Sequence, residues 1–178
     1  DVVYMDLSDI KLRATTRHCV EKAHRNKAKI HAYHIDSAEL PCLSNLNLFE
    51  AMYEVSMQRK NAKKHWRYEH GFFERVLLEL GSERSRFLVT TLDGIVESGC
   101  ILIFDKNVCY YHWAATYGLH KDSGANHFQV LAAANWAKER GCKILHLGGG
   151  LTPKDSLFTF KAGFSPLRKQ CLSCVTNC

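Results

Sequence analysis

A lysine and a run of three glycines are the features of this sequence best suited to chemistry. Gly148, Gly149 and Gly150 follow a short apolar run, where a strand would open into a helix, and Lys161 falls in the last turn of that helix. Glycines let a substrate approach the backbone closely, and the free amides at a helix start attract anions. A positioned ammonium group stabilises an oxyanion that forms during a reaction. Each feature also has a plainer interpretation, because three glycines make a flexible turn and a lysine suits the end of any helix.

The strand expected over residues 108–116 carries four large polar or aromatic side chains in a row. Alternation along a strand places Tyr111 and Trp113 on one face, and Tyr110 and His112 on the other. We expect one pair to belong to the core and the other to face a substrate, and the sequence leaves open which is which. Histidine titrates near neutral pH, so His112 is a candidate to take a proton from an attacking group.

The excess of positive charge is concentrated in two segments. The chain of 178 residues has 24 Lys and Arg against 18 Asp and Glu, a formal charge of +6. Residues 11–29 contain seven basic side chains against Glu21 alone, and residues 59–67 contain five with no acid. Such clusters favour an anionic partner such as a phosphate, a nucleotide or a nucleic acid. The alternative is that both segments are solvated faces of helices.

Composition excludes several classes of protein. With 46% hydrophobic and 24% charged residues, the chain has the composition of an ordinary globular domain. No apolar run is long enough to span a membrane, and the first residues lack the pattern of a signal peptide. The eight cysteines are too few for a disulfide scaffold and suit a reducing cytoplasm. Cys171, Cys174 and Cys178 are spaced like a metal knuckle, but nothing nearby completes four ligands, so we expect no metal site.

Hydrophobic periodicity and turn residues define the elements that would position these side chains. From the N-terminus we expect a helix from Ser8 or Asp9, a strand over 28–35, a helix from Asn45 or Asn47, a helix over 72–80, strands over 86–92, 95–104 and 108–116, a helix over 125–140, a strand over 142–147, a helix from Thr152 to Gly163, and a strand over 167–176. The almost wholly apolar strand 142–147 is typical of burial on both faces. Hairpin-linked strands followed by a β-α-β-α-β tail predict an α/β fold, with one mixed sheet and helices on its faces.

The order of elements and several stretches of sequence resemble one known superfamily. After the extra first helix, the order is similar to that of the GNAT (acyl-CoA N-acyltransferase) fold. Residues 125–150, which end in Gly-Gly-Gly, and residues 157–164 resemble more narrowly the FemAB-type transferases, which attach amino acids to peptidoglycan precursors. Residues 17–27 and 52–60 are also similar to the second half of those proteins.

The same resemblance implies a domain organisation. FemAB-type proteins contain two tandem GNAT-like subdomains, and this chain is long enough for one. Since its first residue is Asp1 and not methionine, we expect the C-terminal subdomain of a longer protein. Residues 1–27 would form a basic N-terminal helix that links it to the missing subdomain, and residues 28–178 would form the transferase domain.

The resemblance also implies roles for individual residues. In the family, the pair that corresponds to Phe160 and Lys161 lies at the reaction centre, so Lys161 is expected to stabilise the charge that develops during acyl transfer, with His112 as a second catalytic candidate. The expected substrate-binding residues are Phe160, Tyr111, Gly148, Gly149 and Gly150. No metal is implied.

The donor is the point on which the sequence departs from the wider superfamily. Residues 121–126 occupy the place of the GNAT pyrophosphate loop, where Lys121 and Gly124 match the expected spacing for cofactor binding but Asn126 does not. The same loop suits a simple helix cap. FemAB-type enzymes use aminoacyl-tRNA, so we expect that donor and an amine acceptor such as a UDP- or lipid-linked cell-wall precursor, in the cytoplasm. The alternatives are an acyl-CoA-dependent N-acetyltransferase and a non-catalytic GNAT-like module that binds an anionic ligand.

Overall fold

The computed structural model describes residues 1–33, 40–120, 122–150 and 155–170. Its elements, in chain order, are β1 (Val2–Asp6), α1 (Ala14–Arg25), β2 (Ala28–Tyr33), α2 (Leu40–Arg59), a short 3-10 helix (Lys64–Trp66), α3 (Phe72–Arg84), β3 (Ser85–Leu92), β4 (Ile95–Asp105), β5 (Val108–Thr116), α4 (Ala125–Glu139), β6 (Ile144–Gly148), α5 (Ser156–Ala162) and β7 (Arg168–Lys169). None of the helices in these ranges is both long and apolar enough to cross a membrane.

The strands form one mixed sheet in the order β2-β3-β4-β5-β6-β1-β7. Strands β2 to β5 are antiparallel neighbours, β5 and β6 are parallel, and β1 is antiparallel to both β6 and β7. The predicted hairpin between the strands expected over 86–92 and 95–104 is confirmed, and its two turn residues, Asp93 and Gly94, both have positive φ, as in a type I′ turn. The predicted α/β fold with a mixed sheet is therefore confirmed.

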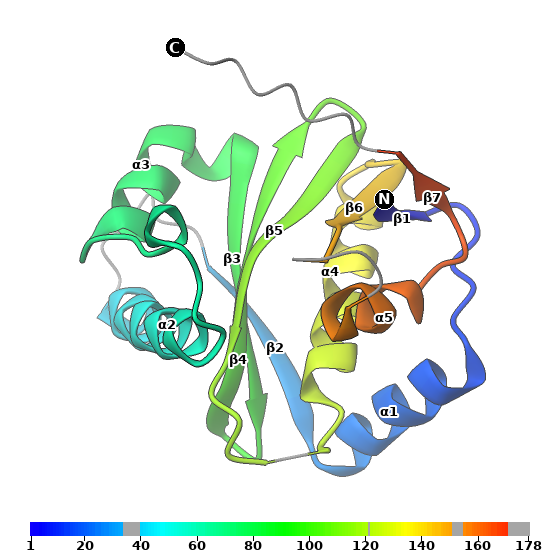
Figure 1. Cartoon of the computed structure of the whole chain (residues 1–178), viewed down its shortest axis with the longest axis horizontal. Coiled ribbons are helices and arrows are strands. Elements are labelled where there is room, and N and C mark those ends of the chain that lie inside the picture. Colours follow the sequence, from blue (N-terminus) through cyan, green and yellow to red (C-terminus); the bar gives the residue numbers. More distant parts are fainter. Residues whose placement is uncertain (34–39, 121, 151–154, 171–178) are drawn as a thin grey trace.

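Helices cover both faces of this sheet (Figure 1). On one face, Phe49 of α2 and Phe73 of α3 pack on Phe87 of β3, in a cluster rich in aromatic rings. On the other face, α4 lies across the strands and buries Val130 and a row of alanines against Leu88 and Leu102. The core is thus split into two apolar layers by the sheet.

The N-terminal segment differs from the sequence prediction. Residues 2–6 form the unpredicted strand β1, which lies inside the sheet between β6 and β7. Ser8 bonds back to Asp6 in a turn, and the helix begins only at Ala14, so the predicted cap at Ser8 or Asp9 is wrong. Helix α1 packs against α4, and the hydroxyl of Thr16 donates to the carbonyl of Gly163 at 3.0 Å. The division of the chain at residue 27 stays a prediction, while β1 and α1 belong to the same layers as the later elements.

Several other elements differ from the prediction in where they begin or end, or in how they are buried. Helix α2 begins at Leu40, before the predicted start at Asn45 or Asn47. In β6, Leu145 and Leu147 are buried while Ile144, His146 and Gly148 are only partly so, which makes the strand alternate where burial on both faces was expected. The last strand is limited to Arg168–Lys169 among the described residues. Thr152 lies outside them, but Asp155 is extended and is the N-cap of α5, so this helix begins at Ser156 and the predicted start at Thr152 is wrong.

Candidate active site

A cavity of about 460 Å³ lies where strands β5 and β6 separate. The two strands pair in parallel only from Val108 with Ile144 to Tyr110 with His146. Beyond these pairs both strands continue, β5 to Thr116 and β6 to Gly148, without partners in each other. The sheet is therefore open at this point, and side chains from both of its faces can reach the same space.

The lining of the cavity confirms this opening, because it comes from helices on opposite faces of the sheet. Tyr53 and Met57 come from α2, Asn126 and Val130 from α4, and Leu157 from α5. Six of the site residues expected from the sequence line it: Tyr111, His112, Gly149, Gly150, Phe160 and Lys161. The sequence analysis missed those from the other face: Tyr53, Ser56, Met57, Lys60 and Trp66. The interleaving of basic and aromatic residues around Trp66 was a signal that could have identified some of these residues.

Lys161 and the glycine run form one structural unit. The Lys161 Nζ donates a hydrogen bond to the carbonyl of Gly149 at 2.7 Å. Gly148 has a φ of +75°, and a Cβ at this position would lie 3.4 Å from the same Nζ. A glycine is required here because the backbone turns through a left-handed conformation directly beneath the ammonium group. Asp155, the N-cap of α5, accepts from the amide of Phe158 and so fixes the start of the helix that carries Lys161.

The charge of Lys161 is modulated by its surroundings. Burial lowers the pKa of Lys161 to about 8, with Asp155 acting in the opposite direction and Lys60 lowering it further. Burial likewise lowers the pKa of Lys60, Arg59 lowers it further and Asp155 raises it. The positive charges of Lys60 and Lys161 therefore repel each other at the cavity, and the carboxylate of Asp155 offsets part of this repulsion.

A β-bulge at His112 overturns the predicted faces of β5. Tyr111 pairs with Leu102 and Trp113 pairs with the adjacent Ile101, so His112 is the extra residue of the bulge. As a result Tyr111 packs with the α4 layer, whereas Trp113 packs with the α2–α3 layer. The prediction that Tyr111 and Trp113 share a face is wrong, because a bulge shifts the alternation by one residue.

The bulge also places His112 in an unusual environment. Its side chain is exposed at the cavity and its ring lies 4.1 Å from that of Trp113, edge to face. Partial loss of hydration at the cavity wall lowers the pKa of His112, and the nearby His146 ring lowers it further. A neutral imidazole at neutral pH is the form that accepts a proton.

The hydroxyl of Tyr111 faces the core and not the cavity. It accepts a hydrogen bond from the Gln129 amide at 2.8 Å, and the Gln129 carbonyl accepts from Thr90 at 3.1 Å and Ser98 at 2.5 Å. Gln129 is almost fully buried, so this network satisfies its polar groups inside the α4 layer. Tyr111 thus offers the cavity its ring, and its hydroxyl has a structural task.

The loop before α4 has two anchors of its own. Glu97, only 1% exposed, accepts from the His120 amide at 3.3 Å and contacts the His120 Nδ1 at 3.0 Å. Gly124, with a φ of +82°, lies so close to α1 that a Cβ would be 2.0 Å from the Cys19 carbonyl oxygen. The structure gives this glycine a packing role, and it does not line the cavity. Lys121 lies outside the described residues, so the cofactor-binding role of this pair stays a prediction.

Within the described ranges, no three His, Cys, Asp or Glu side chains gather as metal ligands. Cys100, Cys109 and Cys142 are buried free thiols, as their apolar sequence context predicts. Cys171, Cys174 and Cys178 lie outside the described residues.

Solved structures with this fold include transferases of several kinds. FemX superposes with a TM-score of 0.75 at 14% identity, over 91% of this chain and 57% of its own. The C-terminal domain of a putative lysylphosphatidylglycerol synthetase from Agrobacterium fabrum gives 0.64 at 16% identity, over 92% of this chain and 55% of its own. An aminoglycoside acetyltransferase from an uncultured soil metagenomic sample gives 0.63 at 12% identity, over 86% and 98%. This chain therefore spans little more than half the length of the first two proteins. At these identities the likeness shows a shared fold.

Sequence comparison assigns the family. No curated protein sequence matches the chain. The model of the acetyltransferase (GNAT) domain matches residues 11–161, a stretch that includes α4, the glycine run and Lys161. The chain belongs to the GNAT acetyltransferase domain family, which supports an N-acyltransferase activity.

Proposed function

We propose that this chain transfers an aminoacyl group from aminoacyl-tRNA to an amine, with Lys161 as the catalytic residue that stabilises the transition state. The observation that carries the proposal is the position of the Lys161 ammonium group in the wall of the cavity between β5 and β6. One of its N–H groups is held by the Gly149 carbonyl, and the other two, which have no hydrogen-bond partner among the described residues, are donors for a substrate.

The chemistry follows from this placement. The acceptor nitrogen attacks the carbonyl carbon of the donor ester, and a C–N bond forms while the carbonyl oxygen gains negative charge. The two free N–H donors of Lys161 stabilise that oxyanion. His112, also in the wall of the cavity, accepts the proton that the attacking amine loses. The C–O bond to the ribose then breaks, and the departing oxygen takes the proton from His112 to become a hydroxyl, which returns His112 to its neutral form.

An aminoacyl donor and a cell-wall or lipid-linked acceptor are supported by the kind of proteins that share this fold. Among these proteins are FemX and the C-terminal domain of a putative lysylphosphatidylglycerol synthetase. The basic segments 11–29 and 59–67 add a charge that suits a polyanionic donor. The competing donor is an acyl-CoA thioester, which is favoured by the family description and by the aminoglycoside acetyltransferase among the similar structures.

The test is a transfer assay with purified chain, followed by mass spectrometry of the acceptor. Alanyl-tRNA and acetyl-CoA serve as alternative donors, and a UDP-linked cell-wall peptide with a free amine serves as acceptor. We expect transfer from alanyl-tRNA, and a loss of about 100- to 1000-fold in kcat for Lys161→Ala, the usual effect of removing an oxyanion donor.

Lys169→Ala is the matched control, since Lys169 is an exposed lysine of β7 outside the cavity. Its activity should equal that of the unmodified chain. Transfer that persists in Lys161→Ala at the level of the control would refute the catalytic assignment, and transfer from acetyl-CoA alone would replace the proposed donor.

A further inference from the structure

The segment between α2 and α3 combines positive charge with aromatic rings. Residues 59–68, called here the basic-aromatic segment, contain five Lys and Arg residues, no acid, and the rings of His65, Trp66 and Tyr68. Lys60 and Trp66 line the cavity, so the segment reaches from the surface into the candidate active site. The proposed chemistry uses neither side chain.

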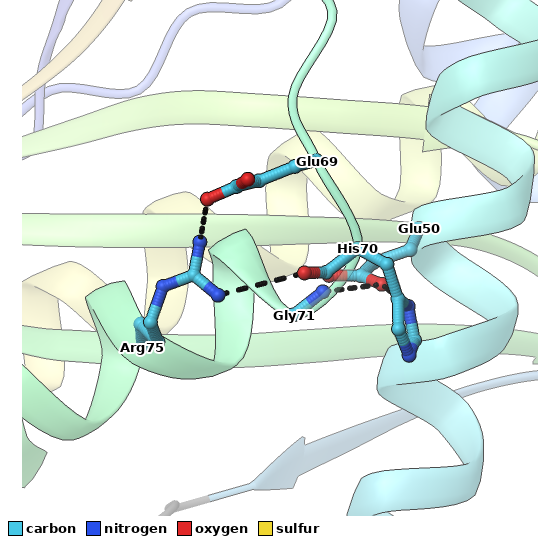
Figure 2. Close-up of polar contacts among 5 residues, drawn as sticks. All are labelled: Glu50, Glu69, His70, Gly71 and Arg75. Atoms are coloured by element: carbon cyan, nitrogen blue, oxygen red, sulfur yellow. Dashed lines mark hydrogen bonds and ion pairs between the residues drawn. The ribbon is translucent and has the colours of Figure 1, made fainter.

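This segment is held in place by ion pairs at its end and just beyond it. Arg67 donates its Nε to Glu54 of α2 at 3.0 Å. Figure 2 shows the neighbouring contacts, in which Glu50 of α2 bonds to the His70 ring at 2.7 Å and to the amide of Gly71 at 3.2 Å, while Arg75 pairs with Glu69. The nearby carboxylates are therefore engaged with residues that fix the backbone.

Of the other four cations of the segment, Arg59 donates to the Thr116 carbonyl at 3.5 Å, and the three lysines are left for a partner. Lys60, Lys63 and Lys64 form no ion pair within the part of the chain that the structure describes. Trp66 keeps 43% of its surface exposed although it also lines the cavity. A flat ring beside several unpaired cations is the arrangement by which proteins bind single-stranded nucleic acids, with bases stacked on the ring and phosphates on the cations.

We propose that the basic-aromatic segment binds the single-stranded 3′ end of an RNA donor. Trp66 stacks on a base, Lys63 and Lys64 contact backbone phosphates, and Lys60 lies where the last nucleotide enters the cavity. This inference rests on the proposed function, because an RNA bound in this way would have its aminoacyl ester beside Lys161.

A single strand fits these features better than other anions. A duplex hides the faces of its bases, so an exposed ring gains nothing from it except at an end. An acidic peptide would use the lysines but has no general counterpart for the ring. The surface is continuous with the cavity through Lys60 and Trp66, so an extended strand can lie on the segment and place its terminal ester inside.

The test measures binding and not transfer. The probe is a single-stranded RNA of about eight nucleotides that ends in CCA and carries a 5′ fluorophore, titrated by anisotropy at several salt concentrations. We expect Trp66→Ala to weaken binding roughly tenfold or more, with partial rescue in Trp66→Phe. The dependence of log affinity on log salt should stay unchanged in both variants, because stacking releases no counterions.

Lysine variants should show the opposite signature. The plot of log affinity against log salt has a negative slope. Lys63→Ala and Lys64→Ala are each expected to make this slope less steep by about 0.7, the value for one phosphate contact on a single strand. Lys138→Ala, which removes an exposed lysine in the last turn of α4, is the control for non-specific charge. Thermal melting confirms that each variant is folded.

Two outcomes would overturn the inference. One is that Lys138→Ala changes the slope as much as Lys63→Ala, and the other is that a blunt duplex binds as tightly as the single strand. Failure here is distinguishable from failure of the proposed function: a chain that transfers from acetyl-CoA without binding the oligonucleotide loses this inference and keeps its acyl transfer. A chain that binds the oligonucleotide through Trp66 but transfers nothing loses the proposed function alone.

Discussion

Lys161 owes its chemical character to the groups packed around it. Burial lowers its pKa to about 8, and the Gly149 carbonyl fixes one of its protons. The group is therefore still mostly charged at neutral pH, yet it loses its charge far more readily than an exposed lysine. His112 has its pKa lowered for a similar reason and is neutral under the same conditions.

These two residues predict a bell-shaped pH dependence of kcat/KM. His112 must be neutral to accept a proton, so the rate rises as pH increases through a pKa below 6.5. Lys161 must be protonated to stabilise an oxyanion, so the rate falls as pH increases through about 8. The measurement uses initial rates corrected for spontaneous hydrolysis of the donor. A guanidinium group stays charged, so Lys161→Arg should remove the descending limb, and an unchanged limb in that variant would assign it to another group.

The separate elements of the site differ in how far the sequence could predict them. Gly149 and Gly150 were proposed from their place where a strand opens into a helix, whereas Phe160 and the catalytic role of Lys161 were implied by the resemblance to FemAB-type proteins. Tyr53 and Lys60 were missed, since they reach the cavity only through the gap between β5 and β6, which no local pattern reveals. The predicted face of Trp113 was wrong because the bulge arises from the pairing of β5 with β4, which the sequence of β5 alone does not show.

A bulge also occurs in strand β4, at Glu97. This residue anchors the loop before α4. Thr90 pairs with Ser98 and Thr91 with Val96, which leaves Glu97 as the extra residue. Its buried carboxylate receives the amide of His120, and its backbone carbonyl receives the amide of Tyr117 at 2.8 Å. One bulge thus places His112 at the cavity, and the other anchors the loop before α4.

Glu97→Gln provides a test of that loop anchor. A neutral amide accepts the His120 amide more weakly than a carboxylate does, so we expect a loss of about 1 kcal/mol in the free energy of unfolding. Amide hydrogen exchange should accelerate at His120. The amide of Tyr117 bonds to the backbone and serves as internal control; equal acceleration at both positions would mean that the loop is not held by the side chain.

In the molecule as a whole, the N-terminal strand lies beside later strands of the sheet, and the N-terminal helix packs on the face of the sheet that α4 covers. Strand β1 completes the sheet beside β6, and α1 approaches the start of α4 so closely that Gly124 has no room for a Cβ. The sequence could not predict β1, since five residues without clear flanking signals give no periodicity to detect. The overall mixed sheet was nevertheless predicted, because the hairpins and the β-α-β units are each local.

Gly124→Ala is expected to cost about 3 kcal/mol in the free energy of unfolding, from a left-handed backbone and a clash with the backbone of α1. Gly141→Ala is the matched control: its φ is +86°, but nothing lies within 4 Å of its Cβ position, so it reports the backbone strain alone. Urea denaturation of both variants gives the difference. If the two lose equal stability, the contact between α1 and α4 is looser than the structure indicates.

The gap between β5 and β6 has a consequence for the order of events in catalysis. The cavity is lined by α2 on one face of the sheet and by α4 and α5 on the other, so in the proposed transfer the donor and the acceptor can contact different walls. A bulky donor held on the α2 side leaves the α4–α5 side free for the acceptor, so neither substrate has to leave before the other arrives. We therefore expect both to be bound at once when the acyl group moves, without a covalent acyl-enzyme between two half-reactions.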